Sequence, residues 1–142
     1  MSYLVDTNLL SELRRKQADP LVVAWFAARP AQSLFLSVLT LGEIRKGIAA
    51  MADVDTLRRQ ALSDWLEMDL PTFFLGRVLS VDAAVADRWG QLQAQAGRPL
   101  PAIDSLLAAT ALQHNLTLVT RNVRDFVGLG VSLVNPWESG PG

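Results

Sequence analysis

Tyr3-Leu-Val-Asp6-Thr-Asn8 is the stretch that decides the fold of this chain. An apolar run over residues 2–5 ends in three polar residues, and residues 9–13 then repeat apolar side chains at helical spacing. The pattern predicts a buried strand, a tight turn and a helix whose cap is Thr7 or Asn8. A cap at either residue leaves the Asp6 carboxylate free for another role.

The same alternation of strand and helix continues along the chain. Further strands are expected at 33–38, 77–81, 116–120 and 131–134, and helices at 21–28, from 40, from 53 or 55 up to Pro71, from 82 to 96 and at 102–113. A turn or short helix is expected at 122–126. This order predicts an α/β fold with a mostly parallel central sheet of about five strands and helices on both faces.

Three local features of the helices can be predicted as well. Thr40 and Glu43 have the spacing of a capping box at a helix start. Pro71 is expected to break the helix that begins at 53 or 55. The helix that follows Pro20 is expected to bury Val23, Trp25 and Phe26.

Acidic residues occur where a parallel sheet would bring them to one edge. Asp6 follows the first strand, Glu43 and Asp104 lie in early helical turns, and Asn122 and Asp125 follow the fourth strand. Carboxylates in a half-buried pocket repel one another unless a cation screens them. With no cysteine and a single histidine, the chain favours a hard cation such as Mg²⁺ over a softer metal.

Each acid also has an ordinary structural interpretation. Capping and metal binding are about evenly matched for Asp6, and capping alone explains Glu43. Asp125 could be a surface residue and Asn122 a turn former. Asp104 is different, because a charge on a nearly all-apolar helix is costly without a partner, which favours metal binding.

Composition limits the remaining possibilities. With 142 residues, 50% hydrophobic and 19% charged, the chain is expected to form one globular domain over 1–137, with a frayed tail at 138–142. No stretch is long enough to span a membrane and no signal peptide is seen, so a cytoplasmic protein is expected. A net charge of −1 argues against broad nucleic-acid binding but allows a local basic rim.

Four basic clusters could form such a rim. Arg45-Lys46 and the pair Arg121 and Arg124 flank the acidic segments, so contact with phosphates is as plausible there as an ordinary solvated surface. The other two clusters are residues 14–16 and 58–59. A solvated helix face is the favoured interpretation of Arg58-Arg59.

Taken together, the segments resemble the PIN-domain nucleases, above all the VapC toxins of bacterial toxin–antitoxin pairs and their FitB-like relatives. The resemblance covers nearly the whole chain. It is carried by Leu4-Val-Asp6-Thr-Asn8, Leu36-Ser37-Val-Leu-Thr40-Leu-Gly-Glu43-Ile-Arg-Lys-Gly47, Asp104-Ser-Leu-Leu-Ala-Ala-Thr-Ala111, Leu118-Val-Thr120-Arg-Asn122-Val-Arg-Asp125-Phe126 and Val134-Asn-Pro-Trp137.

The resemblance implies roles for individual residues. Asp6, Glu43 and Asp104 match the three acidic core positions of the family, with Asp6 and Asp104 bound most directly to Mg²⁺ or Mn²⁺ and Glu43 holding a second metal or positioning water. FitB-like members carry a fourth acid where this chain has Asn122, so either Asp125 supplies that charge or the position is neutral. Supporting residues are Thr7, Asn8, Ser37 and Thr120, of which Ser37 and Thr120 could orient carboxylates or water.

The resemblance also implies an activity and partners. The expected reaction is metal-dependent endonucleolytic cleavage of RNA by activated water, leaving a 5′-phosphate and a 3′-hydroxyl. The expected partners are a second copy of the chain and a small VapB-like antitoxin, with operator DNA in a larger complex and no membrane. Apolar grooves between the early helices, around Leu13, Trp25 and Leu57, could receive the antitoxin.

Two alternatives remain from the residues alone. A different Mg²⁺-dependent phosphohydrolase would use Asp6 as a covalent nucleophile, but such chemistry usually needs a second acid at the position of Asn8. A non-catalytic PIN-like binding module would lose core acids, and all three are present.

Overall fold

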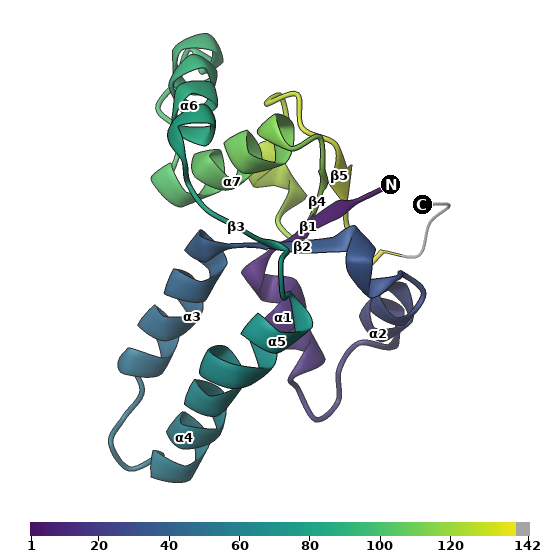
Figure 1. Cartoon of the computed structure of the whole chain (residues 1–142), viewed down its shortest axis with the longest axis vertical. Coiled ribbons are helices and arrows are strands. Elements are labelled where there is room, and N and C mark those ends of the chain that lie inside the picture. The colour runs from purple at the N-terminus through teal and green to yellow at the C-terminus, as the bar shows by residue number, and fades with distance from the viewer. Residues whose placement is uncertain (139–142) are drawn as a thin grey trace.

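The sheet is central to the molecule, as a computed structural model of residues 1–138 shows. Its strands are β1 (Tyr3–Val5), β2 (Leu34–Ser37), β3 (Val78–Leu79), β4 (Thr117–Val119) and β5 (Leu133–Val134). They form one five-stranded sheet in the order β3-β2-β1-β4-β5, and every pairing is parallel (Figure 1). The predicted parallel α/β fold is confirmed, with each strand shorter than expected.

Helices connect the strands in the predicted order. They are α1 (Thr7–Leu13), α2 (Pro20–Ala27), α3 (Val38–Ala49), α4 (Thr56–Asp64), α5 (Leu70–Phe73), α6 (Ala83–Ala96) and α7 (Ala102–Gln113). Short 3₁₀ turns occupy Ala31–Ser33 and Val123–Phe126. In Figure 1, α3 and α4 project together from one side of the sheet, while α6 and α7 pack against each other at the opposite end.

Each face of the sheet is covered by its own core. Alternate residues of β1 point to opposite faces, so Tyr3 and Val5 join one core and Leu4 joins the other. Helices α1 to α5 supply the first core and helices α6 and α7 the second. The resulting three layers leave the carboxyl ends of β1, β2 and β4 at a common edge.

The predicted break at Pro71 is wrong. A π-helical turn over Trp65–Asp69 joins α4 to α5, so helical structure runs from Thr56 to Phe73. Pro71 lies in the first turn of α5. A proline is tolerated there because the widened π turn changes the hydrogen-bond pattern and the missing N–H is not needed.

The burial of α2 also differs from the prediction. Val22 is the fully buried residue of this helix, whereas Val23 is 43% exposed and Trp25 and Phe26 are half-buried. Within residues 1–138, no helix combines the length and apolar character needed to cross a bilayer. The expected frayed tail lies, apart from Glu138, outside the described residues.

Candidate metal-dependent active site

Asp6 lies at the carboxyl end of β1 and is itself the cap of α1. Its Oδ1 accepts a 2.7 Å hydrogen bond from the backbone N–H of Thr7, so the predicted cap at Thr7 or Asn8 is wrong. The helix begins directly after the strand and leaves no intervening turn. Burial raises the pKa of Asp6, opposed by hydrogen bonds from Thr120 and Thr7 and reinforced by the charge of Asp125.

Thr120, at the end of the neighbouring strand β4, and Asn8, in α1, hold Asp6 in place. The Thr120 hydroxyl, at the end of β4, donates to Asp6 Oδ2, and Asn8 Nδ2 lies 3.4 Å from the same oxygen. Asn8 also accepts from the backbone N–H of Arg121, and Thr120 Oγ1 accepts from that of Asn122. These contacts tie the start of α1 to the loop after β4.

Glu43 reaches the same edge from α3. Its Oε1 accepts a 2.9 Å hydrogen bond from the Thr7 hydroxyl, which ties α3 to the start of α1. The predicted capping box is wrong, because Ser37 caps α3 by accepting from the backbone N–H of Leu39. Thr40 instead lies fully buried inside the helix. Glu43 is thereby available to the site rather than engaged in a cap.

Asp104 lies in the first turn of α7, as predicted from its apolar neighbours. Burial raises its pKa, followed by the charges of Asp125, Asp6 and Glu43 in that order. Three other predicted acids therefore contribute to the electrostatic environment of Asp104. Asp125 lies within the 3₁₀ turn at Val123–Phe126 and is exposed. Asn122, which directly precedes this turn, is exposed as well.

The acids share one edge of the sheet without forming a closed ligand cage. In residues 1–138, no three histidine, aspartate or glutamate side chains lie close enough together to hold a metal ion jointly as they stand. The donors are nevertheless all oxygen atoms, and after burial the nearby charges of Asp125, Asp6 and Glu43 raise the pKa of Asp104. A hard divalent cation is the ligand that such a donor set suits.

Most of this chain matches a known protein family. Residues 3–128 match the PIN domain family. The chain belongs to the PIN-domain family. Toxin FitB of Neisseria gonorrhoeae is 36% identical over 138 residues, covering 95% of this chain and 98% of FitB. VapC ribonuclease Y4jK of Sinorhizobium fredii is also 36% identical, over 95% of this chain and 97% of its own length.

Solved structures of PIN-domain toxins have the same fold. FitAcB from Neisseria gonorrhoeae superposes with a TM-score of 0.87 at 34% identity, covering 96% of this chain and 99% of that one. A toxin–antitoxin complex from Klebsiella pneumoniae gives 0.73 at 28% identity, over 96% and 99% of the two chains. This PIN domain is therefore a member of the toxin group that includes FitB and VapC.

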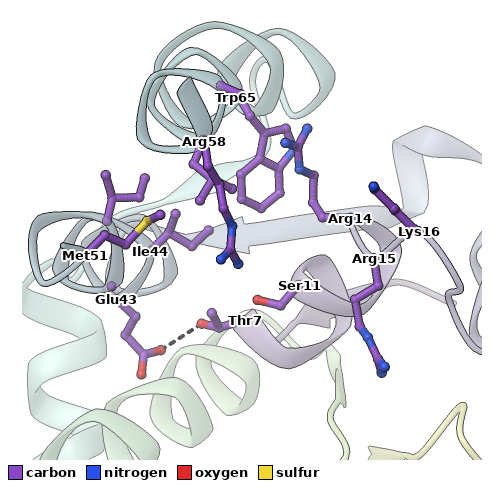
Figure 2. Close-up of a pocket in the computed structure, with 14 residues that line it drawn as sticks. Thr7, Ser11, Arg14, Arg15, Lys16, Glu43, Ile44, Met51, Arg58 and Trp65 are labelled. Atoms are coloured by element: carbon purple, nitrogen blue, oxygen red, sulfur yellow. Dashed lines mark hydrogen bonds between the residues drawn. The ribbon is translucent and has the colours of Figure 1, made fainter. Parts of the chain in front are cut away.

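A groove of about 620 Å³ opens beside Glu43 of this PIN domain, between α1, α3 and α4 (Figure 2). Thr7 and Glu43 form one end of it. Its apolar walls are Ile44, Ile48, Met51, Leu62 and Trp65, and its basic residues are Arg14, Arg15, Lys16 and Arg58. The sequence named residues 14–16 and 58–59 as possible rim clusters, but it favoured a solvated face for Arg58, since the direction of a helix face depends on tertiary packing.

Of the grooves expected around Leu13, Trp25 and Leu57, the described residues show an apolar hollow at Leu13, which Trp25 and Leu57 do not line. Trp25 packs edge-on against Tyr3, with ring centroids 5.0 Å apart, and Leu57 is 89% exposed on α4. Leu13 lines its hollow with Phe26 and Trp65. The three residues were grouped by their apolar character, which does not fix the direction in which each side chain points.

The predicted RNA-contact residues have different surroundings. Arg45 forms a 2.6 Å ion pair with Glu67. The Arg121 guanidinium lies 5.3 Å from the ring centroid of Trp137, while its backbone N–H joins the site through Asn8. Lys46 and Arg124 are exposed. A contact between any of these four and RNA stays a prediction.

Proposed function

We propose that this PIN domain is a metal-dependent endoribonuclease that uses Mg²⁺ or Mn²⁺. The proposal is supported by the position of Asp6, Glu43 and Asp104 along one edge of the sheet, where burial and then the charges of Asp125, Asp6 and Glu43 raise the pKa of Asp104. A phosphodiester brings further negative charge to this edge. Carboxylates alone would repel it, so the chemistry requires a bound cation.

Asp6 and Asp104 would hold the ion, and Glu43 would hold a second ion or position the attacking water. When bound, such an ion lowers the pKa of a water molecule and neutralises charge on the phosphate. Thr120 orients Asp6 through its hydroxyl, and Thr7 orients Glu43 in the same way. In-line attack at phosphorus then yields a 5′-phosphate and a 3′-hydroxyl.

Asp125 is the better candidate for the fourth acidic position. Its charge raises the pKa of both Asp6 and Asp104, and for Asp104 it is the largest contribution after burial. Asn122 contributes a backbone N–H to Thr120 and no charge. The electrostatics support a site of four carboxylates, with Asn122 as a loop residue.

RNA is the proposed substrate and a small VapB-like antitoxin the proposed partner. Y4jK is named a VapC ribonuclease, and solved relatives include a toxin–antitoxin complex and FitAB bound to a DNA fragment. A complex of toxin, antitoxin and operator DNA is proposed here by the same likeness.

We also propose a homodimer, which would cover exposed apolar side chains such as Met68 and Leu75, 65% and 81% exposed.

A covalent mechanism through Asp6 receives less support. One oxygen of Asp6 accepts from the backbone of Thr7 and the other from the hydroxyl of Thr120. Hydrogen bonds to both oxygens lower the nucleophilicity of a carboxylate and orient it as a ligand instead. Trapping of an aspartyl phosphate on Asp6 would revive this mechanism.

The test is cleavage of end-labelled RNA by the purified chain with Mg²⁺ or Mn²⁺. Wild type should cleave, EDTA should stop cleavage, and Asp6→Asn combined with Asp104→Asn should abolish both cleavage and growth arrest. Asp87→Asn, on α6 away from the acidic edge, is the matched control and should cleave like wild type. Unchanged cleavage by the folded double variant, checked by circular dichroism, would exclude the proposal.

A further inference from the structure

We propose that the RNA strand lies in the groove between α1, α3 and α4, with its phosphates on Arg14, Lys16 and Arg58. The inference rests on the proposed ribonuclease activity and names the residues that hold its substrate. It assigns a binding role to α4, which carries none of the candidate metal-binding acids.

The charges along the groove favour a polyanion. Four basic side chains and one carboxylate, Glu43, line it, although the chain as a whole has a net charge of −1. Arg15 pairs with Glu12 at 3.2 Å. Arg14, Lys16 and Arg58 are exposed and form no ion pair within residues 1–138. Their positive charge is therefore available to an incoming ligand.

Neighbouring cations on the same helices are engaged elsewhere. Arg59, next to Arg58 in sequence, forms a 3.0 Å ion pair with Asp53, and Arg45 pairs with Glu67. Both line a separate hollow between α3 and α4. The two sides of this helix pair thus differ: one holds its arginines in ion pairs, and the other leaves Arg58 facing the groove.

The position of the cations relative to the acids favours a substrate path. In Figure 2 the Arg58 side chain extends from α4 into the opening, toward α1, while the Glu43 carboxylate lies at the edge of the same opening, bonded to Thr7. A strand held at Arg58 would continue to the acidic edge. The groove would therefore deliver a phosphodiester to Glu43 and its neighbours.

The apolar walls are compatible with nucleotides. The half-buried Met51 and Leu62 offer apolar surface, and Trp65 adds an aromatic ring of the kind on which bases stack in single-strand binding proteins. A peptide could also contact these walls, but it would need carboxylates spaced to match three separate cations. Every nucleotide of RNA carries a phosphate, so RNA meets this requirement regardless of sequence.

The test compares adjacent arginines of α4. In an Asp6→Asn background, which prevents cleavage, binding of a fluorescein-labelled single-stranded RNA is followed by anisotropy over a range of NaCl concentrations. Arg58→Gln should weaken binding and lower its salt dependence, whereas Arg59→Gln, with the same loss of charge, should not. Thermal melting of both variants checks that each remains folded.

A pair of double variants gives the size of the effect. Each lost phosphate contact lowers the slope of log affinity against log salt by about 0.7. Arg14→Gln with Arg58→Gln should therefore lower the slope by about 1.4 and the affinity by about tenfold at physiological salt. With Asp6 restored, the same double variant should raise KM and leave kcat nearly unchanged. Arg59→Gln with Arg88→Gln is the control of equal charge.

Four outcomes would overturn the proposal. Equal losses in the two double variants would indicate general charge rather than a groove, and no loss in either would place the RNA elsewhere. If wild type cleaves RNA while the groove variant binds it normally, only the groove assignment fails, and an antitoxin segment becomes its better occupant. If wild type neither binds nor cleaves RNA, the proposed function fails as well.

Discussion

The Thr120 hydroxyl donates a 2.8 Å hydrogen bond to Oδ2 of Asp6, across 114 residues of sequence. Both groups are buried, and Asp6 is ionised near neutral pH only if its oxygens are well satisfied. This hydrogen bond therefore stabilises the folded state and also orients the Asp6 carboxylate.

Thr120→Val should lower both stability and activity. Valine has the shape of threonine but leaves one oxygen of a buried carboxylate without its hydroxyl donor, at a cost of about 1.5–3 kcal/mol. Urea denaturation would measure the loss, and RNA cleavage should fall with it. Thr120→Ser restores the hydroxyl and should recover most of both properties. Full activity in the valine variant would show that Asp6 needs no such support.

Thr40→Val should have the opposite effect on stability. The Thr40 hydroxyl is fully buried and has no hydrogen-bond partner among the described residues. Replacing it with a methyl group removes an unsatisfied polar atom and should raise the free energy of unfolding by about 1 kcal/mol. The same urea titration applies. A marked loss of stability would reveal a partner for this hydroxyl.

Asp104→Asn should raise the melting temperature at about pH 7 in EDTA. Burial, then the charges of Asp125, Asp6 and Glu43, raise the pKa of Asp104 in the folded protein. A raised pKa favours the folded state while the group is protonated, and that contribution is lost as pH rises through the folded pKa. The advantage of the asparagine variant should therefore shrink on acidification.

Metal addition provides an independent check on Asp104. Mg²⁺ or Mn²⁺ should raise the melting temperature of wild type more than that of Asp104→Asn, because binding to the folded state stabilises it. Asp87→Asn again serves as the control. Equal metal responses in wild type and Asp104→Asn would remove Asp104 from the ligand set.

Glu12→Gln should make the protein less sensitive to acid. Glu12 is buried, and its pKa is lowered by the backbone N–H of Asp19, then by hydrogen bonds and charge from Trp137 and Arg15. A lowered pKa contributes stability above the unfolded value that disappears as pH falls through the folded value. Melting curves between about pH 7 and pH 3 should fall more steeply for wild type than for the variant.

Much of the fold could be predicted because strand and helix periods alternate clearly in the sequence. The errors lie at the junctions. Asp6 and Ser37 end their strands and cap the next helices at once, whereas the prediction left room for a turn and moved the caps to Thr7 and Thr40. Local propensity cannot choose between nearby Ser, Thr and Asp residues when packing decides which one is buried.

The residues of the site also fall into those that the sequence predicts and those that it does not. The acids could be predicted because parallel strands end at one edge, and Asp104 stands out as a charge on an apolar helix. The basic side of the groove could not, because Arg58 and Arg59 are adjacent and equivalent in sequence. Only the pairing of Arg59 with Asp53 and the packing of α4 beside α1 and α3 separate them.

The strand order has a consequence for synthesis on the ribosome. Strand β1 is synthesised before the other strands, yet it lies between β2 and β4 in the sheet. Thr120, which orients the Asp6 carboxylate at the end of β1, is synthesised 114 residues later. At about 5–20 residues per second, translation takes roughly 6 to 23 seconds to cover that distance. A nascent chain therefore lacks the hydroxyl that orients Asp6 until β4 and Thr120 have been synthesised, so the proposed active site cannot be complete before then.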